Sequence, residues 1–136
     1  MLLRILITAN ALVFVLIVPV LEVGPSHVFN PEWPAHAKLH EVWQLATNAT
    51  LSLLALWLSW RRQNSGIAAL ISLAIGGGFV FAYLAQQAYG GSMAHPDGSE
   101  LLVLGVNPAI GVVGLISVGL VAGLLLQHRR TAPRAA

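Results

Sequence analysis

The sequence predicts an all-α membrane protein, a bundle of four transmembrane helices with the N- and C-termini both in the cytoplasm. Of its 136 residues, 57% are hydrophobic and 9% are charged, which is the composition of a membrane protein rather than of a soluble domain. Four apolar runs, residues 5–21, 42–60, 66–89 and 101–126, each have the length with which a helix crosses about 30 Å of hydrocarbon. With short links between the runs, residues 1–136 form a single integral membrane domain.

The charged residues predict the orientation of the bundle. Cytoplasmic loops carry an excess of Lys and Arg, so the segments before the first run, between the second and third, and after the fourth are expected inside. Those segments hold six of the seven basic residues: Arg4, Arg61, Arg62, Arg129, Arg130 and Arg134. The five acidic residues then face out: Glu22, Glu32, Glu41, Asp97 and Glu100. We expect a multi-pass protein of the bacterial inner (cell) membrane, with its chemistry on the outer side.

The first run follows Arg4 and contains Asn10 near its middle and Pro19 near its outer end. An arginine followed by an apolar run is also typical of a signal peptide. This run is long for such a signal, and no small-x-small cleavage site follows Pro19 before Glu22. We therefore expect a retained first helix.

An outer loop, residues 22–40, leads into the second helix. Asn30 is a preferred N-cap residue, Pro31 suits the first helical position, and Glu32 suits the first turn. These signals predict a helix that begins above the membrane at about Pro31 and continues to Trp60.

The third and fourth runs are rich in glycine. Gly76, Gly77 and Gly78 lie at the centre of the third run, and Gly119 and Gly123 have the spacing of a small-residue contact face in the fourth. Small residues let transmembrane helices approach closely, so we interpret these glycines as sites of helix packing.

The second helix carries the strongest candidate for a functional site. At about 100° per residue, a set of polar side chains falls on one half of the helical wheel, while mostly apolar residues fill the other half. This polar set includes His36, His40, Glu41, Gln44 and Asn48. Polar groups this deep in a membrane usually face a bundle interior or a wet cavity. Four side chains of other segments have a similar depth: Glu22, Tyr83, Gln87 and Asn107. Together they predict a polar, ligand-binding pocket in the outer half of the bundle, roofed by the outer loop.

The pattern His36-x-x-x-His40-Glu41 has several interpretations. The histidines can be interfacial scaffolding that hydrogen-bonds the loop. They can also be catalytic acid–base groups together with Glu41, because imidazole exchanges protons near neutral pH. Haem ligation or a proton relay is a further interpretation.

Metal binding is a weaker alternative for the same two histidines. Histidines at i and i+4 share a helix face, and Glu22, Glu32 or His95 would have to complete the shell. His27 and His95 stand singly in loops, where a solvated histidine is the usual finding.

The absence of cysteine excludes disulfides, thiolate nucleophiles and Cys-ligated metal centres. We expect no cofactor. Because the basic residues flank the spans, the expected partners are membrane lipids and not nucleic acid.

Residues 30–43 resemble known proteins. Asn30-Pro31, Trp33-Pro34, His36-Ala37 and His40 match the pattern Asn-Pro-x-Trp-Pro-x-His-Ala-x-x-His of a small, uncharacterised family of four-span membrane proteins. More distantly, five residues resemble the start of the second helix in the emopamil-binding-protein-like (EXPERA) superfamily, which includes sterol isomerases: Pro31, Trp33, Glu41, Gln44 and Leu45. This resemblance implies a membrane cavity in which His and Glu move a proton. It casts His36 or His40 with Glu41 as that pair and adds Trp33 to the ligand-binding residues.

The function that the sequence favours is binding of a lipophilic small molecule, such as an isoprenoid, a sterol-like molecule or an acyl lipid. Proton-transfer isomerisation or cyclisation is the corresponding enzymatic activity. The alternatives are a non-catalytic accessory subunit of a larger membrane complex and an outer-side metal-binding protein. The protein partners to be expected are further copies of this chain, in a homo-oligomer, or the subunits of such a complex.

Overall fold

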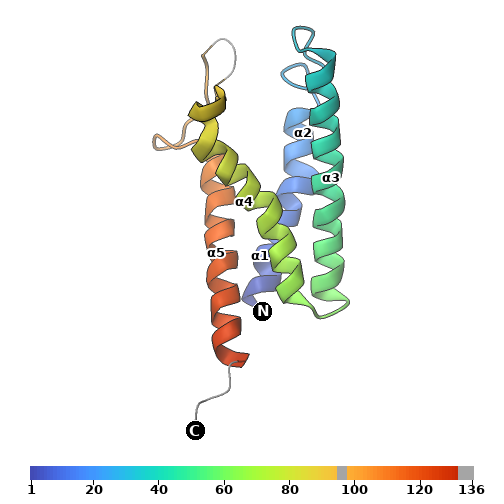
Figure 1. Ribbon diagram of the computed structural model, residues 1–136, viewed down its shortest axis with the longest axis vertical. Helices are drawn as coiled ribbons and strands as arrows, with labels where there is room; N and C mark the ends of the chain where they lie inside the picture. Colours follow the sequence, from blue (N-terminus) through green and yellow to red (C-terminus); the bar gives the residue numbers. More distant parts are fainter. Residues whose placement is uncertain (95–97, 132–136) are drawn as a thin grey trace.

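The computed structural model describes residues 1–94 and 98–131, which form an all-helical bundle (Figure 1). Three residues named in the sequence analysis, His95, Asp97 and Arg134, lie outside the described residues. The elements are α1 (Leu2–Leu12), the π-helix η1 (Val13–Ile17), α2 (Val18–Glu22), α3 (Ala35–Trp60), α4 (Ser65–Tyr89) and α5 (Pro108–Thr131). The first three continue one another as one rod, Leu2–Glu22.

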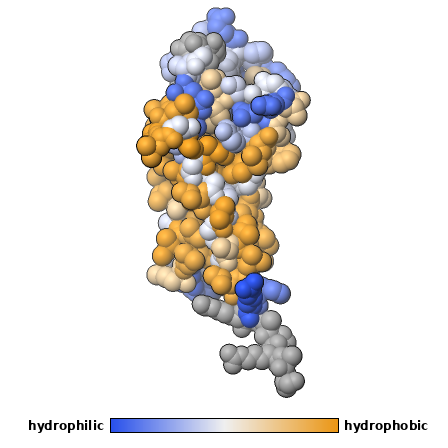
Figure 2. Space-filling model, turned by 90° about the vertical axis from the view of Figure 1, so that its left-hand side faces the viewer, coloured by the Kyte–Doolittle hydropathy of each residue, from blue (hydrophilic) through white to orange (hydrophobic). Residues whose placement is uncertain are grey.

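Three helical segments are long and apolar enough to cross a membrane: Leu2–Glu22, Ser65–Tyr89 and Pro108–Arg129. Figure 2 shows that the middle of the face in view is mostly hydrophobic, with hydrophilic residues towards both ends. α3 has 26 residues and is long enough, but polar side chains such as Gln44 and Asn48 interrupt its apolar sequence. Three of the four expected spans are therefore confirmed as helices of transmembrane length and apolarity.

The rod Leu2–Glu22 widens into a π-helix just before Pro19. Proline lacks the N–H that would close an α-helical turn, and its ring crowds the carbonyl one turn earlier. A π-helical segment relieves that crowding without ending the helix. The first helix therefore continues through Pro19 to Glu22.

α3 begins at Ala35 and not at Pro31, so the predicted start of this helix is wrong. Asn30 does act as a cap, but its Oδ1 accepts from the backbone N–H of Glu32 at 2.9 Å within a turn of the link. Pro34 explains the difference, because a proline keeps the preceding residue, here Trp33, out of the helical region. The helix starts as soon as this restriction ends, with Pro34 at the N-cap position.

α4 and α5 are bounded by recognisable caps. Asn64 Oδ1 accepts from the Ile67 N–H at the start of α4, and Gly90, with a φ of +72°, ends that helix in the left-handed conformation. α5 starts at Pro108, after Asn107 Oδ1 accepts from the Ala109 N–H at 2.9 Å. The fourth apolar run was expected to be helical from Leu101; instead, its first residues form a tight turn closed by backbone bonds between Val103 and Val106.

α1 lies at the centre of the bundle and packs against α3, α4 and α5. The start of α1, the turn between α3 and α4, and the end of α5 all lie at one end of the molecule (Figure 1). α4 is tilted: it starts beside α3, and its last turns lie with α5, away from α3 (Figure 1). The half of α3 that is distant from the α3–α4 turn is therefore not covered by α4.

The helices touch most closely at three glycines. A Cβ on Gly76 would lie 3.0 Å from Asn10 Oδ1, 3.1 Å from Ser117 Oγ and 3.3 Å from Val113 Cγ1, so α1, α4 and α5 meet there. Gly119 and Gly123 of α5 face Leu6 and Leu3 of α1 in the same way. The contact role of Gly119-x-x-x-Gly123 agrees with the sequence prediction.

In the glycine triplet of α4, only the first residue makes such a contact. A Cβ on Gly77 or Gly78 would meet nothing within 4 Å. The sequence could not distinguish the three, because their difference depends on which face of α4 points to α1.

Gly76→Ala is expected to destabilise the bundle by about 1–3 kcal/mol, because the new methyl group must displace Asn10 and Ser117. The matched control, Gly77→Ala, adds the same methyl group in open space. It should leave stability unchanged or raise it by up to about 1 kcal/mol, since alanine favours the helix. Thermal unfolding in one detergent compares them, and equal midpoints for the two variants would show that Gly76 is not a contact position.

Candidate functional site

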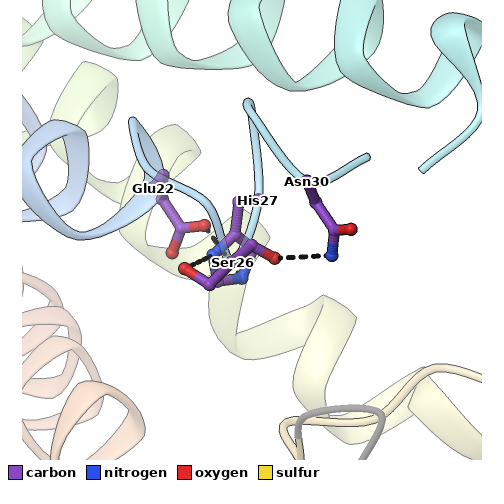
Figure 3. Close-up of polar contacts among 4 residues, drawn as sticks. All are labelled: Glu22, Ser26, His27 and Asn30. Atoms are coloured by element: carbon purple, nitrogen blue, oxygen red, sulfur yellow. Dashed lines mark hydrogen bonds and ion pairs between the residues drawn. The ribbon is translucent and has the colours of Figure 1, made fainter. Parts of the chain in front are cut away.

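The link between α2 and α3 folds around a close contact between the Glu22 carboxylate and the His27 imidazole (Figure 3). His27 Nε2 lies 3.1 Å from Glu22 Oε2, and His27 Nδ1 lies 3.0 Å from Ser26 Oγ. Asn30 Nδ2 donates to the carbonyl oxygen of Ser26 at 3.2 Å. These four residues form one connected polar network at the end of α2.

The turn at Gly24 and Pro25 brings the network together. The Val28 N–H donates to the Glu22 carbonyl at 3.1 Å, and the Phe29 N–H donates to the Gly24 carbonyl at 2.9 Å. The chain thus reverses directly after α2, which places His27 over the carboxylate of Glu22. His27 had been expected to be solvated; the signal missed in the sequence was an acid and a histidine five residues apart across a Gly-Pro turn.

Trp33 belongs to this link network and not to the face of α3. Its ring meets the His27 ring edge-on, with the centroids 5.4 Å apart and the planes at 83°. This contact joins the second half of the link to its first half, so Trp33 is a packing partner of His27.

The order Ser26–His27–Glu22 resembles the hydroxyl–imidazole–carboxylate relay of acyl-transfer enzymes. Such enzymes also need N–H groups that converge on a developing oxyanion. Here the N–H groups of His27, Val28, Phe29 and Asn30 all donate to carbonyls within the same turn. The arrangement therefore stabilises the link rather than preparing an acyl transfer.

His36 and His40 form a pair on the exposed first turns of α3. Their Nε2 atoms lie 3.0 Å apart, and their rings meet edge-on with centroids 4.4 Å apart. One of the two nitrogens donates and the other accepts, depending on the tautomer. Because the i, i+4 spacing places both rings on one face of the helix, two Nε2 atoms converge on one point.

A shallow groove of about 280 Å³ continues from this pair along α3. Its lining residues all belong to α3: His40, Trp43, Gln44, Thr47 and Asn48. The Trp43 ring lies 5.8 Å from the His40 ring and forms an apolar wall, whereas Gln44, Thr47 and Asn48 supply hydrogen-bond donors and acceptors. Gln44 and Thr47 in the groove are exposed, and the part of α3 that carries them lies apart from the last turns of α4 (Figure 1).

The other residues expected in the pocket lie elsewhere. Glu41, which was expected to act together with His36 or His40, is partly buried on α3. The ring of His40 contacts His36 and Trp43. Tyr83 and Gln87 belong to the last turns of α4, which lean towards α5. Asn107 caps α5, and its Nδ2 donates to Glu100 Oε1 at 3.0 Å. The predicted site residues are thus distributed over three places: the link network, the α3 groove, and the outer ends of α4 and α5.

Among residues 1–94 and 98–131 there is no cluster of three or more His, Asp or Glu side chains that could hold a metal ion. Comparisons with models of protein families, with curated proteins and with solved structures found no match to this chain. The resemblance to the emopamil-binding-protein-like superfamily stays a prediction.

Proposed function

We propose that the protein binds a lipophilic small molecule with a polar head, and that the α3 groove receives this head in the outer half of the membrane. In this proposal α3 is the fourth membrane span, the arginine-bearing end is cytoplasmic and the end with the link network faces out. The observation that carries the proposal is the uncovered polar face of α3, where Gln44 and Thr47 are exposed beside Trp43.

Uncovered amide and hydroxyl groups are costly in hydrocarbon, where no water can bond them. A molecule that offers a hydroxyl or carbonyl group to Gln44, Thr47 and Asn48 removes that cost. The groove volume of about 280 Å³ is at the lower limit for a whole drug-sized ligand, so it suits a head group whose apolar tail runs along α3 among the lipids. Isoprenoids, sterol-like molecules and acyl lipids share this chemistry.

The His36–His40 pair at the end of the groove supports an enzymatic form of the proposal. In a proton-transfer isomerisation or cyclisation, an imidazolium gives a proton to one carbon of a double bond, and a neutral imidazole accepts one from another carbon. The two rings, with their Nε2 atoms 3.0 Å apart, can hold one proton between them and exchange roles. Glu41, the next residue along α3, is the third member of the proposed catalytic set.

The test of ligand binding uses isosteric changes on α3. Thr47→Val and Asn48→Leu should each lower the amount of lipophilic molecule retained after gentle purification by about tenfold, because each removes hydrogen bonds to the head group. Thr50→Val makes the same change as Thr47→Val one turn away and should retain the parent amount. Mass spectrometry of extracted molecules measures the difference. Equal retention by all three variants would favour the accessory-subunit alternative.

Metal binding at the same histidines is the second candidate, and the observation that favours it is the convergence of the two Nε2 atoms. Purified protein should bind Zn²⁺ or Cu²⁺ in titration calorimetry, and the affinity should fall on acidification, because a protonated imidazole has no free lone pair. His36→Ala and His40→Ala should each abolish binding, whereas His27→Ala should not. Binding that survives both substitutions would place the metal elsewhere.

The proposed orientation can be tested directly because the chain contains no cysteine. A cysteine at Ser92, in the exposed link after α4, should react with a membrane-impermeant thiol reagent in cells with a permeabilised outer membrane. A cysteine at His128, near the end of α5, should react only after lysis. Labelling of His128→Cys from outside would reverse the proposed topology.

A further inference from the structure

At the end of the bundle opposite the link network, Arg4 holds a positive charge among neutral partners. Its guanidinium donates to Gln63 Oε1, and its Cζ lies 5.6 Å from the centroid of the Trp60 ring. The acidic residues of the described chain, Glu22, Glu32, Glu41 and Glu100, all belong to the other end. No carboxylate of the described chain therefore balances Arg4.

Gln63 links Arg4 to the turn that ends α3. Its φ of +56° lies in the left-handed region, which costs a residue with a side chain roughly 1–2 kcal/mol. Both polar atoms of its side-chain carboxamide are hydrogen-bonded: Oε1 accepts from Arg4, and Nε2 donates to the Trp60 carbonyl at 3.1 Å. The left-handed conformation belongs to the end of α3, where the Asn64 N–H donates back to the Leu58 carbonyl at 3.0 Å, so the helix-ending turn fixes the position from which Gln63 reaches Arg4.

Arg4 and Gln63 line a cavity of about 530 Å³ between the start of α1, the α3–α4 turn and the end of α5. The wall combines hydrogen-bonding groups with leucines, and its members include Leu3, Arg4, Gln63, Ser65, Leu126 and Gln127. Polar donors next to aliphatic side chains match a molecule that has an anionic head and a hydrocarbon part.

Aromatic and basic residues place this cavity at the level of lipid head groups. Trp60 lies against Arg4, and the Arg62 guanidinium lies over the Trp57 ring at 4.8 Å from its centroid. Tryptophans beside arginines mark the boundary between hydrocarbon and water in membrane proteins.

We propose that this cavity is a binding site for an anionic phospholipid, with the phosphate on the Arg4 guanidinium and the acyl chains along Leu3 and Leu126. A planar guanidinium can donate two parallel hydrogen bonds to phosphate oxygens, and a phosphate supplies the counter-charge that the described residues do not provide for Arg4. A zwitterionic head group brings its own cation into a site that is already positive, so a net negative lipid is preferred. The site is independent of the α3 groove.

The experiment titrates purified protein in a neutral detergent with short-chain phosphatidylglycerol and with phosphatidylcholine of the same acyl length, measured by native mass spectrometry. Phosphatidylglycerol should bind more tightly, and Arg4→Gln should weaken it at least about tenfold. Arg62→Gln removes the same charge from the same end but outside the cavity, and should weaken binding by only about two- to threefold. Arg4→Lys keeps the charge and should retain part of the affinity.

The variant Gln63→Gly distinguishes the role of Gln63 in positioning the Arg4 guanidinium from its role in the stability of the fold. Glycine accepts the left-handed conformation, so the variant should unfold at the same or a higher temperature while its affinity for phosphatidylglycerol falls. Equal losses for Arg4→Gln and Arg62→Gln, or equal binding of the two lipids, would overturn the proposal. So would competition by millimolar inorganic phosphate as effective as that by the lipid, because the site would then take a soluble anion.

Discussion

The close approach of α1, α4 and α5 at Gly76 is the constraint on which the rest of the bundle depends. At this point Gly76 leaves room for Asn10 and Ser117, and α4 cannot move towards α1 or α5 without a clash. A second contact, 3.4 Å between Ser59 Oγ and Ser65 Oγ, holds the beginning of α4 beside α3. A helix held beside α3 at its beginning and against α1 and α5 at its middle must be tilted. Its last turns then leave α3, so the half of α3 that carries the groove residues is not covered by α4 (Figure 1).

The centre is held by shape more than by hydrogen bonds. Side-chain polar atoms of Asn10, Ser52, Ser72 and Ser117 are buried and have no hydrogen-bond partner among the described residues. Each such atom costs about 1–3 kcal/mol, so these groups do not stabilise the bundle as donors and acceptors. Their small size contributes to stability because it lets neighbouring helix backbones approach closely. The close approach leaves Ile7 and Leu120 fully buried in the hydrophobic core. The stability of the bundle therefore depends on small side chains that cannot be enlarged.

Much of the fold could be predicted from the sequence, and the failures have physical causes. Helix length and apolarity predicted where helices occur, because hydrocarbon thickness imposes both. The start of α3 was predicted wrongly because two prolines give opposite signals there. Pro31 suits the first turn of a helix, but Pro34 keeps the preceding residue out of the helical conformation, so the helix starts only at Ala35. For the site, the helical wheel identified the polar face of α3, since that face depends only on local geometry. Which residues lie opposite it depends on the tilt of α4, and a wheel contains no information on tilt. Tyr83, Gln87 and Asn107 were therefore assigned to a pocket from which that tilt removes them.

The two ends of the molecule balance their charges in different ways. At the end with the link network, the carboxylates find partners within the chain: Glu22 pairs with His27, and Glu100 accepts from Asn107. At the other end, arginines lie on tryptophan rings and a carboxamide, which stabilise a cation without neutralising it. Two carboxylates at one end thus have partners supplied by the fold, whereas the described guanidinium groups of Arg4 and Arg62 at the other end contact neutral side chains. In the proposed orientation, anionic lipids of the leaflet next to the arginines would supply that counter-charge.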